Sequence, residues 1–283
     1  MDFRVCRFYA ADAFLARAES WLLRAEAEHN LLLGLAHRLR ASAEGYEPPI
    51  YLATVEDADG VVGCAFRTPP FKLGLTRIPA GALPALVEDV AAVYPSLPAV
   101  LGPEPEARRF AELWAERKGN RARPGMRQRI FQLDRVIWPE RQPAGTLRVA
   151  GPEDRELVEH WMWAFSAEAG TPTHRIGRMA EERIRERAIF LWEDPEPCSM
   201  AGWVGQSPNG VRIGYVYTPL ELRGRGYASA CVAQASQRAL DAGCRFCFLY
   251  TDLANPTSNS IYRRIGYQPV CDVVDWHLEE EAS

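Results

Sequence analysis

The chain has 283 residues, of which 47% are hydrophobic and 25% charged, which is ordinary for a soluble protein and long enough for two domains. Its formal net charge of -4 argues against nucleic-acid binding, which usually needs a basic surface. No apolar run approaches the length of a membrane span, and the N-terminus lacks the basic start of a secretion signal. Scattered cysteines without such a signal favour reduced thiols, so we expect a cytoplasmic protein without membrane or nucleic-acid partners.

The first half alternates helices with short strands. Its apolar periodicity and the turn signals Asp59-Gly60 and Pro69-Pro70 define the elements. In chain order they are a helix over 12–40, strands over 50–55, 61–67 and 71–77, a helix over 83–93, a strand over 99–101, a helix over 106–118 and a strand over 128–135.

The second half shows nearly the same order. Its predicted elements are a strand over 146–149, helices over 154–168 and 175–187, strands over 188–193, 198–205 and 211–217, a helix over 227–241, a strand over 245–251, a helix over 257–265 and a strand over 272–278. Two copies of one fold explain this repetition, although any α+β domain can show a similar order. Prolines and a glycine within Trp138 to Gly145 indicate a linker, which predicts domains at 1–140 and 141–283.

The most informative stretch joins a buried strand to a helix. The apolar run Val211 to Tyr217 precedes the turn Arg223-Gly224-Arg225-Gly226, and a helix begins at Tyr227. Two glycines permit backbone conformations that side chains forbid, and they let another molecule approach closely. The unpaired N–H groups and the positive dipole end at a helix start favour an anion, most naturally phosphate, and the arginines add positive charge.

Two motifs in the second half carry a family resemblance. Arg223-x-x-Gly226-x-Ala228 resembles the pyrophosphate signature of the GNAT superfamily, the acetyl-CoA-dependent N-acyltransferases. After the next predicted strand, Asn255-x-x-Ser258-x-x-x-Tyr262-x-x-x-Gly266-Tyr267 resembles the following motif of that family, in the expected order and spacing. The resemblance covers the stretch from Thr146 to Glu279.

The resemblance implies an α+β fold with two GNAT-like domains, each a mixed, mostly antiparallel sheet flanked by helices. It also implies transfer of an acetyl group from acetyl-CoA, as co-substrate, to an unidentified amine by direct attack in a ternary complex. A monomer or a homodimer fits equally well. The residues that it assigns to coenzyme binding are Val216, Tyr217, Thr218, Arg223, Gly224, Arg225, Gly226, Tyr227, Ala228, Ser229, Asn255 and Ser258.

The first half is a degraded copy at the corresponding positions. Pro79-Ala80-Gly81-Ala82 stands where the second half has its phosphate turn, without the arginines or the paired glycines. Counting back from Gly119 as from Gly266 places Ala115 where the second half has Tyr262. We therefore expect that the first domain does not bind acetyl-CoA.

The transfer needs a proton donor for the departing thiolate, and Tyr262 stands at the family's position for that acid. A phenol with a pKa of about 10 is matched to a thiol near 8.5. The alternative is a core aromatic on an amphipathic helix, next to Ile261 and Ile265.

The general base and the acceptor stay open. Many members of the family carry a glutamate on the strand before the turn, but Ile213 to Tyr217 are uncharged. Glu168 and Asp252 are only candidates, and Glu221 lies too close to the turn. By resemblance, the acceptor pocket is formed at the first helix of the domain, whose residues here are Trp161, Met162, Trp163, Phe165 and Glu168. The missing acid also keeps a non-catalytic sensor or scaffold that binds acetyl-CoA as an alternative.

Other functional classes fit less well. Gly224-x-Gly226-x-x-Ser229 is close to a dinucleotide-binding fingerprint, but several residues separate the strand from the glycines, and the chain lacks successive strand–helix units. Cys244-x-x-Cys247 lies at the start of a strand, where residues three apart face opposite sides, so core packing is the better interpretation. The histidines show no metal-binding spacing, and we predict no metal.

Overall fold

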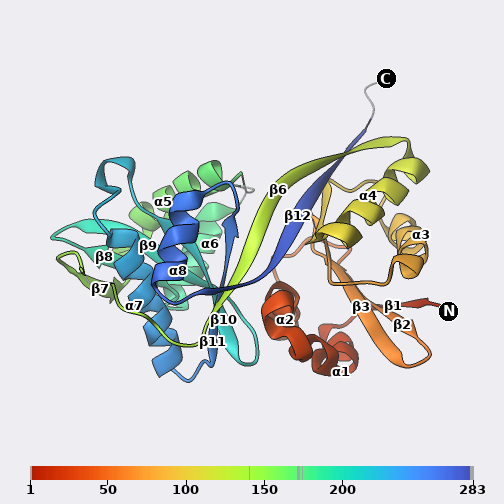
Figure 1. Cartoon of the computed structure of the whole chain (residues 1–283), viewed down its shortest axis with the longest axis horizontal. Helices are drawn as coiled ribbons and strands as arrows, with labels where there is room; N and C mark the ends of the chain where they lie inside the picture. The colour runs from red at the N-terminus through yellow and green to blue at the C-terminus, as the bar shows by residue number, and fades with distance from the viewer. Residues whose placement is uncertain (1, 140, 171–172, 174, 281–283) are drawn as a thin grey trace. The chain divides into compact units, whose positions relative to one another are not determined.

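The computed structural model describes residues 2–139, 141–170, 173 and 175–280. The chain forms two compact units, and neither is continuous in sequence (Figure 1). The first unit comprises residues 1–130, 251–254 and 270–283, and the second comprises residues 131–250 and 255–269. The linker predicted over 138–145 lies inside the range of the second unit, and its residue 140 is outside the described residues.

In the first unit, a sheet of order β1-β2-β3-β4-β5-β12-β6 carries helices on both faces. Neighbouring strands from β1 to β4 are antiparallel, β4 and β5 are parallel, and β5 and β12 are antiparallel. The elements are β1 Arg4–Phe8, α1 Ala11–Leu22, α2 Glu26–Ala41, β2 Tyr51–Asp57, β3 Gly60–Arg67, β4 Leu73–Leu75, α3 Leu83–Val93, β5 Ala99–Pro103, α4 Glu104–Lys118, β6 Asn120–Leu133 and β12 Gln268–Glu280.

Strand alternation produces the two faces of this sheet, because successive side chains of a strand point to opposite sides. Tyr51 and Ala53 of β2 pack with α3 and α4, whereas Leu52 packs with α1 and α2. The single helix predicted over 12–40 is broken at Leu23–Ala25. At this break the ring of His29 donates a hydrogen bond from Nδ1 to the Leu22 carbonyl at 2.8 Å, which satisfies a group that a helix end leaves unpaired.

In the second unit, the strands follow the order β11-β10-β9-β8-β7. All neighbours are antiparallel except β10 and β11, which run parallel. The elements are β7 Thr146–Val149, α5 Arg155–Ala169, α6 Ile176–Arg185, β8 Ile189–Glu193, β9 Pro197–Gln206, β10 Gly210–Tyr217, α7 Tyr227–Asp241, β11 Phe246–Asp252 and α8 Pro256–Arg264. Phe190 and Trp192 of β8 pack with α7, whereas Ile189 and Leu191 pack with α5 and α6.

The last strand predicted for each half contributes to the unit of the other half. The sequence predicted that a strand over 128–135 closes the first half and one over 272–278 closes the second. Instead, Phe131 and Leu133 at the end of β6 lie in the core of the second unit. Residues Val273 to His277 of β12 pair with Ala99 to Pro103 of β5, and Leu278 lies in the core of the first unit.

The order strand, two helices, three strands, helix, strand, helix occurs in both units. This repetition confirms the predicted fold class: two domains of the same kind, each with a mixed, mostly antiparallel sheet between helices. No helix within the described ranges is both long and apolar enough to cross a bilayer.

Candidate active site

Strands β10 and β11 separate toward their C-terminal ends. Their parallel pairing runs from Gly210 opposite Phe246 to Arg212 opposite Phe248. Both strands continue beyond this point, β10 to Tyr217 and β11 to Asp252. The pairing of β10 with β9 is also irregular between Gly214 and Tyr217, and Tyr215 has a positive φ of 50°. A non-glycine residue in this conformation is strained and is held there by its surroundings.

The end of β10 is fixed through its carbonyl groups and hydroxyls. The Ser199 hydroxyl donates to the Tyr217 carbonyl at 3.1 Å and lies 2.8 Å from the Thr218 hydroxyl. The neighbouring Val216 packs against the core that α7 covers. The strand that leads to the turn therefore has a fixed backbone, although Ser199 had no sequence signal that could reveal it.

The turn before α7 is open. Gly224 and Gly226 have φ angles of +79° and +89°, which side chains rarely adopt. A Cβ on Gly224 would meet nothing within 4 Å. Gly226 is the N-cap of α7 and no side chain caps the helix, so the N–H groups of its first turn, Tyr227 to Ser229, lack a capping group. The positive φ angles and the uncapped helix start are as expected from the glycines, and the anion site itself stays a prediction.

Arg223 is already engaged within the unit. Its Nε donates to the Thr218 carbonyl at 2.9 Å, and its Nη2 lies 2.7 and 2.9 Å from the two carboxylate oxygens of Glu168 on α5. Its guanidinium also lies 5.9 Å from the centre of the Tyr217 ring. The pair is half-exposed, so its net contribution to stability is small, about 1 kcal/mol or less. Arg223 thus joins α5, β10 and the turn, and its charge is balanced by Glu168.

The side chains of Arg225 and Tyr227 differ in how they are held. Arg225 is exposed and donates from Nη2 to the Glu221 carbonyl at 3.3 Å. Tyr227 packs into the core, and its hydroxyl donates to Oδ2 of Asp194 at 2.7 Å. This hydrogen bond raises the pKa of the Tyr227 phenol. Tyr227 therefore anchors the start of α7 to the loop after β8.

Tyr262 lies on α8 and is only 8% exposed. Its ring packs against Phe131, at 6.5 Å between ring centres, and against Tyr267, at 6.0 Å. Burial raises the pKa of its phenol to about 12. Within the described residues no hydrogen bond engages its hydroxyl, whereas the Tyr267 hydroxyl lies 2.8 Å from that of Ser236. The ring of Tyr262 therefore packs as a core aromatic, and its role as general acid stays a prediction.

Asn255 and Ser258 begin α8. The Asn255 side chain accepts a hydrogen bond from the Ser258 N–H at 3.0 Å, which is the ordinary cap of a helix start. The helix that carries Tyr262 is therefore positioned by the Asn255 side chain, and this contact is internal to the protein.

The candidate bases have structural partners. Glu168 is bound to Arg223, and the Asp252 side chain accepts a hydrogen bond from the Ala254 N–H at 2.8 Å. Glu221 lies in the exposed turn before Arg223.

Aromatic residues of α5 lie against the irregular end of β10. The ring of Trp161 is 5.9 Å from that of Tyr217, and the ring of Phe165 is 5.6 Å from that of Tyr215. Trp161 and Met162 are buried in the core under α5 and α6, whereas Trp163 is 52% exposed. Two of the five predicted acceptor residues, Trp161 and Met162, are therefore core, and the half-buried Phe165 lies beside Tyr215 near the end of β10.

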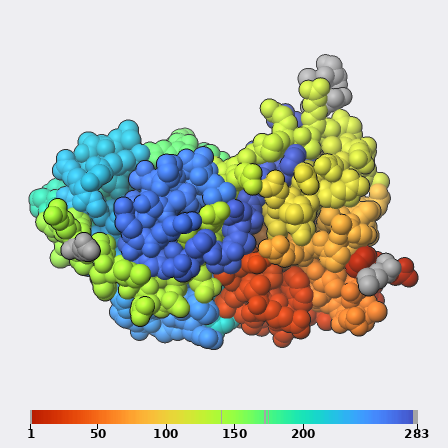
Figure 2. Space-filling model, viewed as in Figure 1, coloured from red at the N-terminus to blue at the C-terminus, as the bar shows by residue number. Residues whose placement is uncertain are grey.

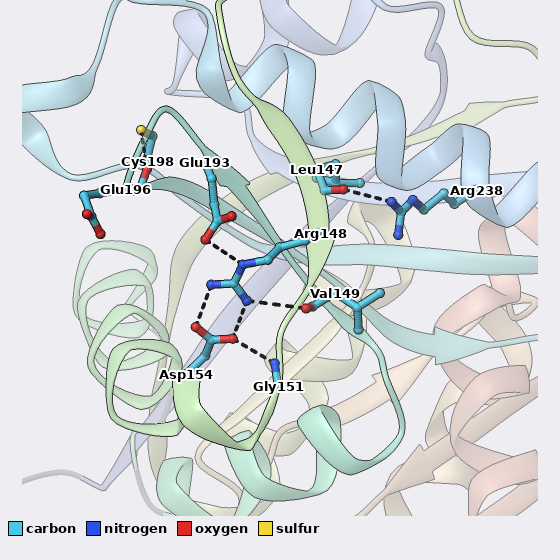
Figure 3. A network of polar contacts seen from close by, with 9 residues as sticks. All are labelled: Leu147, Arg148, Val149, Gly151, Asp154, Glu193, Glu196, Cys198 and Arg238. Carbon is cyan, nitrogen blue, oxygen red and sulfur yellow. Dashed lines mark hydrogen bonds and ion pairs between the residues drawn. The ribbon is translucent and has the colours of Figure 1, made fainter.

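An ion network fixes the start of α5 (Figure 3). Arg148 of β7 donates to both carboxylate oxygens of Asp154, which precedes α5, and to Glu193 of β8 at 2.6 Å. Asp154 also accepts from the Gly151 N–H at 2.8 Å. The hydrogen bonds from Arg148 lower the pKa of the buried Asp154 carboxyl. The helix that frames the irregular end of β10 is held to the sheet at its first turn.

In the described part of the first unit, the corresponding strands do not separate in this way. Its strands β4 and β5 pair from Leu73 opposite Val100 to Gly74 opposite Leu101. At the next position a Cβ on Gly102 would stand 3.0 Å from the Cβ of Leu75, so the strands remain in contact where β10 and β11 separate. Ahead of α3, the segment Pro79 to Ala82 contains no residue with a positive φ.

The family model for the acetyltransferase (GNAT) family matches residues 154–267. This part of the chain is therefore a GNAT acetyltransferase domain, as the two motifs predicted. Comparison with curated proteins found no match.

Solved structures with the same fold extend over both units. A GCN5-related N-acetyltransferase from Sphaerobacter thermophilus is similar with a TM-score of 0.63 and 17% identity, over 99% of this chain and 96% of that one. A GCN5-related N-acetyltransferase from Kribbella flavida has a TM-score of 0.63 and 16% identity, over 92% and 96%. A tandem GNAT protein from the clavulanic acid biosynthesis pathway has a TM-score of 0.55 and 12% identity, over the whole of both chains. At these identities the likeness is one of fold, and it supports two GNAT-like domains in one chain.

Proposed function

We propose that the second unit is an N-acetyltransferase that moves an acetyl group from acetyl-CoA to an amine. The observation that carries this proposal is the separation of β10 from β11, followed directly by the open, uncapped start of α7. An exposed edge of β10 offers backbone groups to an extended pantetheine arm, and the helix start offers N–H donors to phosphate oxygens.

The reaction itself is a single acyl transfer. The nitrogen of a neutral amine attacks the thioester carbonyl carbon, the carbon–sulfur bond breaks, and the sulfur leaves as a thiolate while the nitrogen releases a proton to water. Backbone N–H groups at the end of β10 would stabilise the charge that develops on the carbonyl oxygen. Tyr262, which burial keeps protonated at neutral pH, would donate a proton to the thiolate.

Binding follows from the same residues. The N–H groups of Tyr227, Ala228 and Ser229 would hold the pyrophosphate, with Gly224 and Gly226 allowing its approach. Val216, Tyr217 and Thr218 would contact the pantetheine arm through their backbone. Arg223 would act by positioning the turn, since its guanidinium is bound to Glu168.

Replacing Gly226 with valine tests the coenzyme site. We expect Gly226→Val to abolish acetyl-CoA binding in calorimetry, because a β-branched residue at a φ of +89° would distort the turn and its side chain would stand where phosphate meets the backbone. Gly243→Val is the matched control: φ there is +98°, a Cβ meets nothing within 4 Å, and the residue follows the other end of α7. The parent and the control should bind one coenzyme per chain.

A second occupied site per chain would contradict the closed β4–β5 strand pair of the first unit. Unchanged affinity of a folded Gly226→Val variant would contradict the phosphate site.

A non-catalytic acetyl-CoA sensor is the second candidate, because both Glu168 and Asp252 are engaged and β10 carries no carboxylate near its end. Incubation of the full chain with acetyl-CoA and a panel of amines distinguishes the two functions. An enzyme releases free coenzyme A in proportion to acetylated amine, and a sensor binds acetyl-CoA without releasing it.

A further inference from the structure

The segment between β6 and β7 is attached to the second unit at both ends. At its start, the Ile137 N–H donates to the Ile265 carbonyl at 2.9 Å, directly after the helix that carries Tyr262. At its end, the indole Nε1 of the buried Trp192 donates to the Ala144 carbonyl at 2.9 Å.

The second attachment requires a glycine at position 145. Its φ is +108°, and a Cβ there would stand 2.0 Å from the Glu193 carbonyl oxygen, so only glycine fits. A free tether between domains has no need of such contacts. This part of the chain passes beside α7 (Figure 1), and its yellow-green atoms lie at the surface next to the blue atoms of the C-terminal helices (Figure 2).

Between these attachments, Pro143 lies against the phosphate turn. Its Cδ and Cγ are 3.7 and 3.9 Å from the position that a Cβ on Gly226 would take, and among the described residues no other atom outside the immediate chain neighbours of Gly226 comes within 4 Å of that position. Pro143 therefore forms the protein surface on that side of the helix start. The sequence offered no sign of this contact, because the two residues are far apart in the chain.

The same segment also carries a positively charged side chain close to the turn. Arg223 is neutralised by Glu168, which leaves Arg225 as the arginine of the turn with no acidic partner among the described residues, so a second positive charge would strengthen phosphate binding at the start of α7. Arg141 is exposed, and it makes no ion pair with any residue that the structure describes. It lies two residues before Pro143, a stretch of chain that spans about 7 Å at most, which is within reach of an arginine side chain.

We propose that residues 141–145 form one wall of the phosphate site, with Pro143 beside Gly226 and Arg141 binding the phosphate groups of a coenzyme A thioester. This inference rests on the proposed function of the second unit. It gives the linker a role in ligand binding in addition to joining the two halves.

The test is calorimetry of the full chain with coenzyme A. Arg141→Gln should weaken binding about threefold to tenfold, the effect expected for one exposed charge on a phosphate, and should leave the melting temperature unchanged. Arg185→Gln is the matched control, because Arg185 is an exposed arginine on α6, which packs on the other face of the sheet. Pro143→Gly, which loosens the wall without changing charge, should also weaken binding.

Pantetheine, which has no phosphate, separates a phosphate contact from a general effect. The affinity for pantetheine should be the same in Arg141→Gln and in the parent. Equal losses for coenzyme A and pantetheine, or full coenzyme A affinity in both linker variants, would overturn the inference while the proposed function stands. A parent chain that does not bind coenzyme A at all would overturn the proposed function, and this inference with it.

Discussion

The hydroxyl of Tyr262 is the group on which the proposed chemistry depends most directly. Burial raises its pKa to about 12, so it carries its proton throughout the pH range in which the protein would be assayed. We expect Tyr262→Phe to lower turnover of acetyl-CoA by about 10²–10⁴, the usual effect of losing one positioned acid. The affinity for coenzyme A should stay within about twofold, because phenylalanine keeps the ring contacts with Phe131 and Tyr267.

Tyr267→Phe is the control for this prediction. Tyr267 is a fully buried tyrosine whose hydroxyl bonds to Ser236, so its loss should reduce the free energy of unfolding by about 1 kcal/mol and leave turnover unchanged. If Tyr262→Phe retained full turnover, the thiolate would be protonated by water and Tyr262 would be a packing residue.

For single residues, the sequence predicted local backbone conformation but not contacts with residues far along the chain. The glycines of the turn were predictable because their role is local: a positive φ before a helix start. The partner of Arg223 was not predictable, because Glu168 is 55 residues away and the pair forms only when α5 packs on β10. The same holds for Pro143 beside Gly226. A charge read from the sequence thus identifies a possible phosphate ligand, and only the fold shows that it is already neutralised.

At the scale of elements, the network that holds α5 should make stability depend on pH. The hydrogen bonds from Arg148 lower the pKa of Asp154 in the folded state. A lowered carboxyl pKa contributes stability fully above the unfolded value of about 3.9, and this contribution is lost as the pH falls through the folded value. Asp154→Asn should therefore lower the free energy of unfolding by about 1–3 kcal/mol at pH 7, since Asp154 is buried while Arg148 is partly exposed.

Urea unfolding at several pH values checks this. The difference between the parent and Asp154→Asn should narrow as the pH falls below about 4. Glu112→Gln removes an exposed ion pair with Arg109 on α4 and should change the free energy of unfolding by less than about 0.5 kcal/mol at any pH. A difference between the parent and Asp154→Asn that stayed constant down to pH 3 would show that the carboxylate charge is not what stabilises α5.

Elements with a strong apolar period were predictable almost to the residue, as with Leu83 to Val93 and Tyr227 to Asp241. Strand β1 was missed because most of its residues are at least partly exposed and show no alternation. Strand β6 begins earlier than predicted for a similar reason, since its first ten residues are exposed or half-buried. The helix over 12–40 was predicted as one element because its apolar positions continue across the break at Leu23–Ala25, where the His29 side chain bonds to the Leu22 carbonyl.

At the scale of the whole molecule, the two final strands determine whether the halves can exist apart. A fragment of residues 1–140 would lack β12. The edge of β5 that pairs with β12 would then be unpaired, and Leu278 would be missing from the core. An unpaired, buried strand edge favours aggregation, and loss of a buried leucine costs about 2–5 kcal/mol. A fragment of residues 141–283 would likewise lack the buried Phe131 and Leu133.

We therefore expect neither fragment to unfold cooperatively when it is produced alone, although the fragment of residues 141–283 contains both motifs. Co-expression of the two fragments should restore a soluble complex that binds coenzyme A, because a break at 140/141 leaves every strand present. Circular dichroism melts and gel filtration of the separate and combined fragments measure this. A fragment of residues 1–140 that melted cooperatively as a soluble monomer would show that β5 does not need β12, and the duplication would then consist of two independent domains.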